Sequence, residues 1–398
     1  MSRSHPTLSP SSVIILGGAH GSLALARSLA VLKIPVFYIT NDYPLARWSR
    51  HIKKSIRWSG PQTACATEEL LKIAELYKLR GALLIPASDQ DVKFVSQNTD
   101  VLATRFILMT PEWERLKWLC DKPNLYRRAD ELQIAHPMTY HLTSYDDVYK
   151  KDFHFPIVLK PNMGGGDSAL AKAKVLKVDD KPSFIKVFQT ATREIGLEKI
   201  VIQRLIPGDG DTQLSYAAFW HDGRPVGEFT ARRSRQYPVD FGFTSTFVET
   251  INAPEAITSA RKILSSVRYS GLVEVEFKRD PTNGMLNILD VNPRPWSWFA
   301  LSGATGMNIT QMMWDVMNNR QEKPALPAHS EAAWMYLSRD LVAAVILMMR
   351  GKLRIREYLA SLLRVRAWAA FSWSDLKPGI VDLPITIFRV IKRRIYNK

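Results

Sequence analysis

The order of strand-like and helix-like segments constrains the fold of this chain more than any other feature. Near the start, a short apolar run, Val13–Leu16, precedes a glycine-rich turn, a helical pattern of apolar residues and a second strand-like run, Pro35–Thr40. Further runs follow helical stretches at Leu83–Pro86 and Phe106–Met109. Strands that alternate with helices are typical of a parallel α/β sheet. We therefore expect a Rossmann-like parallel-sheet domain at the N-terminus.

The pattern changes from Pro156 onward. Strand-like runs now follow one another with turns between them, which indicates antiparallel sheet with occasional helices, an α+β arrangement. Past Pro327 the sequence becomes helical, basic and rich in Trp. These changes predict an N-terminal domain at 1–115 and a C-terminal segment at 327–398.

Composition and charge narrow the class of protein. Hydrophobic residues make up 46% and charged residues 23%, which excludes a largely disordered chain. The net charge of +16 favours anionic partners, and residues 339–398 alone hold 13 Lys or Arg against 4 Asp or Glu. Cys65 and Cys120 form no metal or disulfide pattern. No run approaches the ~20 apolar residues of a membrane-spanning helix, and we expect a cytoplasmic protein.

The glycine-rich turn at Gly17, Gly18 and Gly21 leaves two interpretations open. Glycines between a strand and a helix let backbone approach a phosphate, and Asp42 lies near the position of a ribose-binding acid in a dinucleotide fold. This predicts an NAD(P)-linked oxidoreductase. The spacing is not G-x-G-x-x-G, however, and tight α/β turns need glycine in any case.

A second glycine-rich segment follows a lysine. Lys160 ends an apolar strand and precedes Gly164, Gly165 and Gly166, with Ser168 close behind. Three successive glycines leave their amides unshielded, so the loop can fold over a phosphate chain that the lysine meets as a point charge. A flexible hairpin tip with a solvated lysine explains the same residues.

The most informative pattern is an acidic hairpin. Residues 271–278 alternate at period two, so that Glu274 and Glu276 share one face, and a return strand carries Asp290 and Asn292. A hairpin centred on Asn283 places Glu276 opposite Asp290 and Glu274 opposite Asn292. Opposed like charges repel unless a cation lies between them, and oxygen ligands of this kind suit Mg²⁺. An exposed charged hairpin is the alternative.

Arginines near these strands are candidates for binding phosphate. Arg294 follows the return strand within a stiff Pro-Arg-Pro segment, and Arg232, Arg233 and Arg235 lie close together at the end of another strand. Guanidinium groups form forked contacts with phosphate oxygens and stabilise transferring charge. A solvated basic loop explains Arg232, Arg233 and Arg235 about equally well.

Taken together, the ordered motifs resemble the ATP-grasp superfamily. They are Asp121–Leu125 at the start of a helix, Phe155–Gly166, Val201–Gly208, Glu274–Phe277 and Asp290–Arg294. The likeness spans about residues 13–308 and is nearest to the carboxylate–amine ligase branch, which includes carbamoyl-phosphate-synthase-like and D-aspartate-ligase-like members. The resemblance implies a two-lobed ATP-grasp fold behind an N-terminal α/β domain, with the small lobe at 116–190 and the large lobe, which holds the metal site, at 191–326.

The resemblance also implies roles for individual residues. Lys122 and Lys160 would contact ATP, Gly164–Gly166 and Ser168 would cover its phosphates, and Arg294 with Arg232 or Arg235 would stabilise the γ-phosphate. Glu276, Asp290 and Asn292 would hold Mg²⁺, with Mn²⁺ as an alternative. The remaining nucleotide contacts would come from the hinge between the lobes, which comprises Gln203, Arg204, Leu205 and Ile206, and from Asp209 or Asp211 near the ribose.

The implied reaction activates a carboxylate as an acyl phosphate with ATP and joins it to an amine or ammonia. Two residues depart from the family pattern. Arg204 stands where the hinge often has Glu, and Asp290 stands where the metal strand often has Glu. From the implied reaction, the partners are small-molecule carboxylates and amines, and no nucleic acid is expected. An oligomer remains open.

The basic tail leaves three interpretations. Helices with Trp368, Trp373 and many cations suit an anionic membrane surface, which would place the protein peripherally at the inner membrane. Helices packed on the enzyme with a basic outer face explain the pattern slightly more simply, and a polyanionic substrate is a third option. A non-catalytic basic adaptor is accordingly a further alternative function for the whole chain.

Overall fold

The structure is a computed structural model. It describes residues 9–41, 45–163, 170, 175–240, 244–320 and 331–396, with side chains up to residue 388. Asp42 and the predicted phosphate-covering residues Gly164, Gly165, Gly166 and Ser168 lie outside the described residues.

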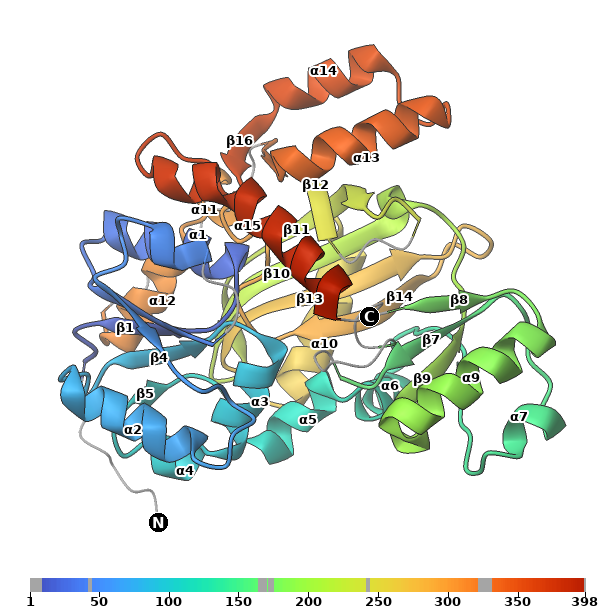
Figure 1. Ribbon diagram of the computed structural model, residues 1–398, viewed down its shortest axis with the longest axis horizontal. Coiled ribbons are helices and arrows are strands. Elements are labelled where there is room, and N and C mark those ends of the chain that lie inside the picture. The colour runs from blue at the N-terminus through green and yellow to red at the C-terminus, as the bar shows by residue number, and fades with distance from the viewer. Residues whose placement is uncertain are drawn as a thin grey trace.

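The first domain is a five-stranded parallel sheet in the order β3-β2-β1-β4-β5. Strand β1 is buried at every position because helices cover both faces of the sheet (Figure 1). The expected strands are confirmed within a residue or two, whereas β3, a partly polar edge strand, was not foreseen. The elements are β1 Val13–Leu16, α1 His20–Val31, β2 Val36–Thr40, β3 Lys54–Arg57, α2 Ala66–Leu76, β4 Leu83–Pro86, α3 Asp89–Gln97, α4 Thr99–Leu102 and β5 Ile107–Leu108.

A four-stranded antiparallel sheet follows, in the order β6-β9-β7-β8. Its apolar face packs on α9, whose Phe184 and Phe188 are buried. Because β9 pairs with β7, this sheet continues beyond residue 190, where the sequence placed the change of lobe. The elements are α5 Trp113–Cys120, α6 Lys122–Glu131, β6 Thr139–Tyr140, α7 Asp147–Lys150, β7 Ile157–Pro161, β8 Leu176–Val178, α9 Lys181–Ile195 and β9 Ile200–Arg204.

The largest sheet has seven strands in the order β14-β13-β10-β11-β12-β15-β16. All neighbours are antiparallel except β15 and β16. The predicted antiparallel region is thereby confirmed. The elements are β10 Gln213–His221, β11 Arg224–Tyr237, β12 Thr244–Ile251, α10 Pro254–Ser266, β13 Gly271–Arg279, β14 Leu286–Asn292, α11 Leu301–Ala304 and α12 Ile309–Met317.

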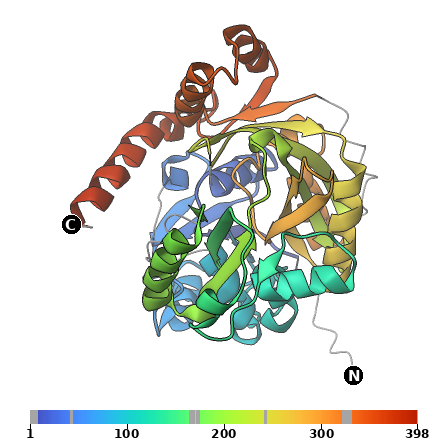
Figure 2. The same ribbon diagram turned by 90° about the vertical axis from the view of Figure 1, so that its right-hand side faces the viewer.

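The C-terminal segment is not wholly helical. It adds two short strands to the large sheet, β15 Ala333–Met335 and β16 Val365–Trp368, and three helices, α13 Leu337–Met349, α14 Ile355–Leu363 and α15 Leu376–Tyr396. In Figure 2, α15 runs outward from the rest of the molecule. Within the described ranges, no helix is both long and apolar enough to cross a membrane.

One core cluster joins the first domain to the large sheet. Leu23 and Leu25 of α1 belong to the same cluster as the buried Trp296 and Trp298. A Cβ on Gly21 would lie 2.6 Å from the carbonyl oxygens of Pro295 and Trp296. Glycine is therefore required here for close packing between the two domains.

Candidate functional site

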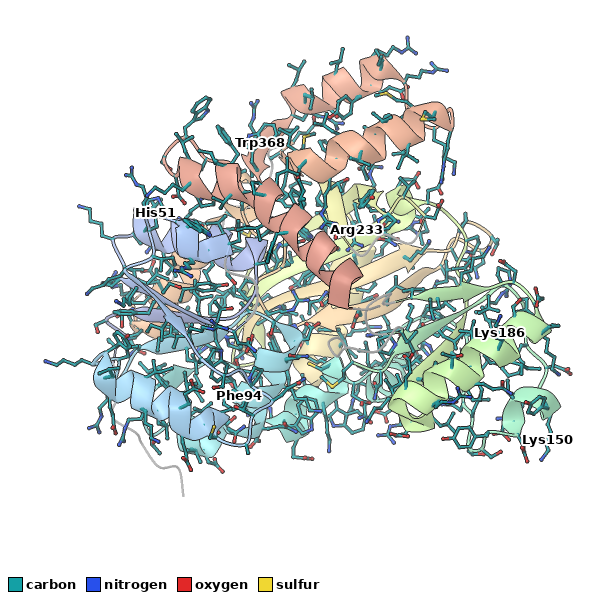
Figure 3. All side chains as sticks on the ribbon, in the orientation of Figure 1. His51, Phe94, Lys150, Lys186, Arg233 and Trp368 are labelled. Carbon is teal, nitrogen blue, oxygen red and sulfur yellow. The ribbon has the colours of Figure 1, made fainter. Side chains whose placement is uncertain are left out.

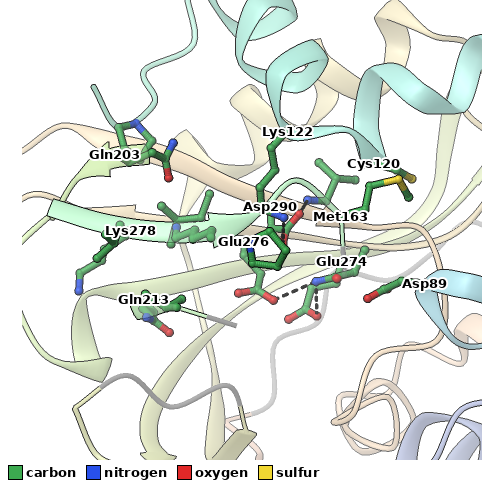
Figure 4. A pocket seen from close by; sticks show the side chains of 18 of the residues that line it. Asp89, Cys120, Lys122, Met163, Gln203, Gln213, Glu274, Glu276, Lys278 and Asp290 are labelled. Atoms are coloured by element: carbon green, nitrogen blue, oxygen red, sulfur yellow. Dashed lines mark hydrogen bonds and ion pairs between the residues drawn. The ribbon is translucent and has the colours of Figure 1, made fainter. Parts of the chain in front are cut away.

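A cavity of about 350 Å³ lies between the four-stranded sheet and the seven-stranded sheet, with α3 of the first domain at its edge. This volume lies in the ~300–1,000 Å³ range of ligand pockets. Figure 4 shows Gln203 and Lys278 toward one end, Asp89 and Cys120 toward the other, and Glu276 between them. Ten of the residues singled out from the sequence line the cavity, namely Lys122, Lys160, Gln203, Arg204, Leu205, Ile206, Glu276, Asp290, Asn292 and Arg294.

The acidic hairpin has the register predicted from its turn. Glu276 pairs with Asp290 and Glu274 pairs with Asn292 across β13 and β14. Between Glu276 and the turn, a bulge shifts the pairing of the two strands by one residue. The alternate side chains of β13, such as Val275, pack in the core. The acidic face is therefore held in place by an apolar face on the same strand.

Hydrogen bonds connect the acidic side chains. Asn292 Nδ2 donates to Glu276 Oε1 at 2.9 Å and to Glu274 Oε2 at 3.3 Å. Glu274 is only 4% exposed and accepts from Ser215 and from the indole of Trp298. Burial, followed by the neighbouring Glu276 carboxylate, raises the pKa of Glu274 well above its usual range. Excess negative charge on this face would be relieved by a cation.

Lys122 reaches the same face from the start of α6. Asp121 caps this helix by accepting from the Asn124 amide, and Pro123 occupies its first turn, as the sequence predicted. The Lys122 Nζ donates to Asp290 Oδ2 at 2.9 Å. Burial alone would lower the pKa of Lys122, but Asp290, together with Tyr126 and Asp89, outweighs burial and raises it. The lysine is therefore a fixed positive charge beside a predicted metal ligand.

Lys160 enters the cavity from the end of β7. Burial, with a smaller contribution from the Lys122 ammonium, lowers the pKa of Lys160 to about 8. The neighbouring Asn162 links the two lysine-bearing elements, because it accepts from the Lys122 amide at 2.9 Å and donates to Asp121 at 2.6 Å. Lys122 of α6 and Lys160 of β7 thus line the same cavity.

The hinge residues lie at the opposite end of the cavity. Gln203 is fully buried, and its Nε2 donates to the Thr139 hydroxyl at 3.0 Å. Arg204 is exposed although it borders the cavity. Asp209 and Asp211 are not among the lining residues, and Asp209 instead accepts from Lys352 of the C-terminal segment at 2.7 Å. A ribose contact by either acid stays a prediction.

The structure corrects the choice of arginine on β11. Arg232 pairs with Glu249 on the far face of the sheet. Arg235, only 5% exposed, is bound by the buried Asp340 at 2.9 Å. It is Arg233 that lines the cavity, where it donates to Glu276 at 3.2 Å (its place in the molecule is labelled in Figure 3). Alternation separates Arg233 from Arg232, and a bulge between 233 and 235 turns Arg235 away.

Arg294 lies in the cavity as expected. Its Nε donates to Asp89 of α3 at 2.5 Å, and one terminal nitrogen donates to Asn292 Oδ1 at 3.2 Å. The arginine thereby connects the acidic hairpin to the first domain. Asp89, like the half-buried Cys120, lay outside the sequence-based selection because no local pattern links it to the hairpin.

The glycine turn of the first domain does not match the dinucleotide interpretation. A Cβ on Gly17 would lie 2.0 Å from the Asp91 carboxylate, and one on Gly18 would lie 2.6 Å from the Ala87 carbonyl oxygen. Together with the contact of Gly21 with the large sheet, these approaches show that the space around the turn is filled by protein. The glycines serve packing.

The hairpin residues fit a magnesium ion by their chemistry. The carboxylates of Glu276 and Asp290 and the amide of Asn292 are hard oxygen donors facing one cavity, and Mg²⁺ typically combines one or two carboxylates with water and substrate phosphate. In the part of the chain that the structure describes, no three His, Cys, Asp or Glu side chains form a ready metal cage. The donor set therefore suits an ion shared with a phosphate ligand.

Comparisons with known proteins bear on the fold and on the class of protein. No family model matches the chain. A curated relative, the D-aspartate ligase of Enterococcus faecium (strain Aus0004), is 20% identical over 320 residues, covering 75% of each chain. This relative and the structural matches together confirm the resemblance to the carboxylate–amine ligase branch of the ATP-grasp superfamily.

Those structures share the fold at low identity. N5-carboxyaminoimidazole synthetase from Staphylococcus aureus complexed with ADP matches with a TM-score of 0.63 and 14% identity, over 88% of this chain and 89% of that one. L-amino acid ligase from Bacillus licheniformis matches with a TM-score of 0.59 and 12% identity, over 80% and 75%. Rhizobium etli pyruvate carboxylase matches with a TM-score of 0.61 and 16% identity, over 81% of this chain but only 30% of that one.

Proposed function

We propose that this protein is an ATP- and Mg²⁺-dependent ligase that activates a carboxylate as an acyl phosphate and joins it to an amine or ammonia. The observation that carries the proposal is the convergence of Lys122 and Lys160 on the acidic face of the β13–β14 hairpin within one cavity. Proteins similar to this chain include a D-aspartate ligase by sequence and an L-amino acid ligase by fold.

The role proposed for each residue follows from its charge. Lys122 and Lys160 bind the phosphates of ATP, and Glu276, Asp290 and Asn292 hold Mg²⁺, which would supply charge neutralisation to the transferring phosphoryl group. Arg294 and Arg233 stabilise charge on the γ-phosphate. Arg232 and Arg235 do not take this role because their guanidinium groups are engaged elsewhere.

The reaction has two steps. A carboxylate oxygen attacks the γ-phosphorus, the bond to the bridging oxygen breaks, and ADP leaves with that electron pair. The amine nitrogen then attacks the acyl carbon, phosphate leaves, and the nitrogen loses a proton. Closure of Gly164–Gly166 and Ser168 over the phosphates would keep water from the acyl phosphate.

Turnover of a Glu276→Gln variant tests the proposal. We expect ADP release from the parent protein only with MgATP and a suitable carboxylate, found by screening carboxylate pools. Glu276→Gln, which loses a metal-binding charge, should reduce turnover by at least ~100-fold. Glu198→Gln, at an exposed acid of the small lobe, is the matched control and should leave turnover unchanged. Equal turnover in Glu276→Gln would contradict the proposal.

Several finer expectations extend the proposal. We infer that the parallel-sheet domain is Rossmann-like and shapes the acceptor end of the cavity through Asp89. The domain boundaries stay predictions, although the four-stranded sheet extends past residue 190 to β9. Use of Mn²⁺ in place of Mg²⁺, an oligomeric assembly and a cytoplasmic location stay predictions. The NAD(P)-linked and non-catalytic alternatives are not favoured, since the glycine turn is filled and the cavity gathers groups suited to phosphoryl transfer.

A further inference from the structure

The C-terminal helices expose an unusual amount of apolar surface. On α13, Leu337, Leu341, Val345 and Met349 follow one another at intervals of four residues and are 44–83% exposed. Side chains at this spacing lie on one face of a helix. The helix therefore presents a continuous apolar ridge outward.

Two more helices repeat this arrangement. On α14 the ridge comprises Ile355, Leu359 and Leu363, which are 57–78% exposed. On α15 it comprises Leu376, Ile380, Leu383 and Ile387, which are 45–69% exposed. Trp373, in the loop before α15, is 85% exposed. Large exposed apolar patches of this kind mark interaction sites. We call these three ridges with Trp373 the C-terminal apolar face.

The same helices are fixed to the enzyme by their inner sides. Asp375 accepts from Arg27 at 2.9 Å and from Ser49 at 2.6 Å, and Asp340 binds Arg235. Val381 and Ile385 of α15 pack against the main core cluster. Since the inward side is already occupied, the apolar ridges are outer faces of docked helices. Trp368, labelled in Figure 3, lies on β16, the strand that follows α14 and belongs to the seven-stranded sheet.

Charge around the apolar face is almost entirely positive. Of the four acids in residues 339–398, Asp340, Asp375 and Asp382 are buried, which leaves Glu357 as the exposed one. Exposed cations, by contrast, are frequent, and four of them have no ion pair with any described residue, namely Arg354, Arg356, Arg366 and Lys377. The surface thus combines apolar ridges with unneutralised positive charge.

We propose that the C-terminal apolar face docks the enzyme on an anionic lipid bilayer. Apolar side chains enter the acyl boundary, Trp suits the headgroup level, and Lys and Arg meet anionic lipid phosphates. A second copy of the chain is a poorer occupant, because a symmetric interface would bring two sets of unneutralised cations together. Docking of this kind is independent of the ligase reaction, so either proposal can fail alone.

Vesicle co-sedimentation of the full chain tests docking. We expect binding to vesicles of phosphatidylcholine mixed equally with phosphatidylglycerol, weaker binding to phosphatidylcholine alone, and a decrease with added salt. The double variant Ile380→Asp with Leu383→Asp should weaken binding at least ~tenfold, because each change places a charge where an exposed aliphatic side chain would enter the acyl boundary. A second variant, Arg356→Glu with Lys377→Glu, should weaken binding and flatten its salt dependence.

Matched controls use equally exposed apolar residues elsewhere. Val31→Asp on α1 and Leu76→Asp on α2, at residues that are 79% and 75% exposed, should leave vesicle binding unchanged. Thermal unfolding of each variant checks that the fold is retained. Absence of binding to anionic vesicles, or equal loss in the controls, would overturn the proposal. So would sedimentation velocity showing a dimer that Ile380→Asp with Leu383→Asp dissociates while vesicle binding is absent.

Discussion

The interlobe cavity and the C-terminal segment both depart from the usual pattern of apolar residues inside and charged residues outside. The cavity buries charged residues, whereas the C-terminal segment exposes apolar ones. In the cavity, carboxylates and lysines such as Glu274 and Lys122 are buried. On the C-terminal helices, large apolar side chains such as Met349 and Ile380 are exposed. Buried charge is costly without partners, and exposed apolar surface is costly without cover. Both departures therefore mark places where the chain is built to bind something else.

The two regions also differ in how their ion pairs work. In the C-terminal segment, Asp340 and Arg235 form an enclosed pair with two contacts at 2.9 Å, which leaves the arginine no further role. In the cavity, Glu276 contacts Arg233 and Asp290 contacts Lys122, and both carboxylates still border open space. The first kind of pair holds an element in place, and the second kind leaves charge available to a ligand.

The largest effect should come from breaking the enclosed pair. Asp340→Ala leaves the Arg235 guanidinium buried without its carboxylate, and we expect unfolding to become easier by about 3–5 kcal/mol, measured by urea denaturation. Asp222→Ala, which removes an exposed ion pair with Arg268, should cost less than ~1 kcal/mol. Similar losses in the two variants would show that the pair does not anchor the C-terminal segment.

A smaller effect should follow loss of charge from the cavity. Lys160→Met removes one of the two phosphate-binding lysines, and we expect turnover to fall by about 10²–10³-fold. Since burial lowers the pKa of Lys160 to about 8, the ligand-free parent loses the ammonium as pH rises through 8. Its affinity for MgATP, measured by calorimetry, should then decrease above that pH.

The Lys160→Met variant should show no such step in its pH profile. Lys186→Met, at an exposed lysine on α9, is the matched control and should leave both turnover and the pH step unchanged. If the step persists in Lys160→Met, another group is responsible for it.

The smallest effect concerns the acidic face itself. Burial and Glu276 raise the pKa of Glu274 from 4.5 to about 7, so between these values the folded protein binds more protons than the unfolded chain. Stability should therefore fall as pH rises from 4.5 to 7. Glu274→Gln removes this dependence and should stabilise the ligand-free protein above pH 7 by about 1–3 kcal/mol. Urea denaturation of both proteins across this range measures it, and parallel profiles would contradict the assignment.

Much of the cavity could be predicted from local sequence. The alternation of β13 separates Glu274 and Glu276 from the core, and both acids have the partners in β14 that a hairpin centred on Asn283 predicts. Local rules suffice here because a hairpin is formed by residues that are neighbours in the chain. Beyond Glu276 the bulge shifts the register by one, which the turn alone does not reveal.

The arginines show where such reasoning ends. Arg232, Arg233 and Arg235 lie within four residues, yet they point to Glu249, to the cavity and to Asp340 respectively. The acids that bind Arg232, Arg233 and Arg235 lie 17, 43 and 105 residues away in the sequence, respectively. Their choice depends on a bulge and on helix α13, neither of which a local pattern contains.

The sequence by itself determined the alternation of strands and helices, the acidic hairpin and the excess of positive charge near the C-terminus, because each depends on spacing within one short segment. Only the tertiary structure decided which arginine enters the cavity, why Gly21 must be glycine and which side of the C-terminal helices faces outward. These features depend on contacts between segments far apart in the chain, and contact free energies of that kind are set by packing rather than by local propensity.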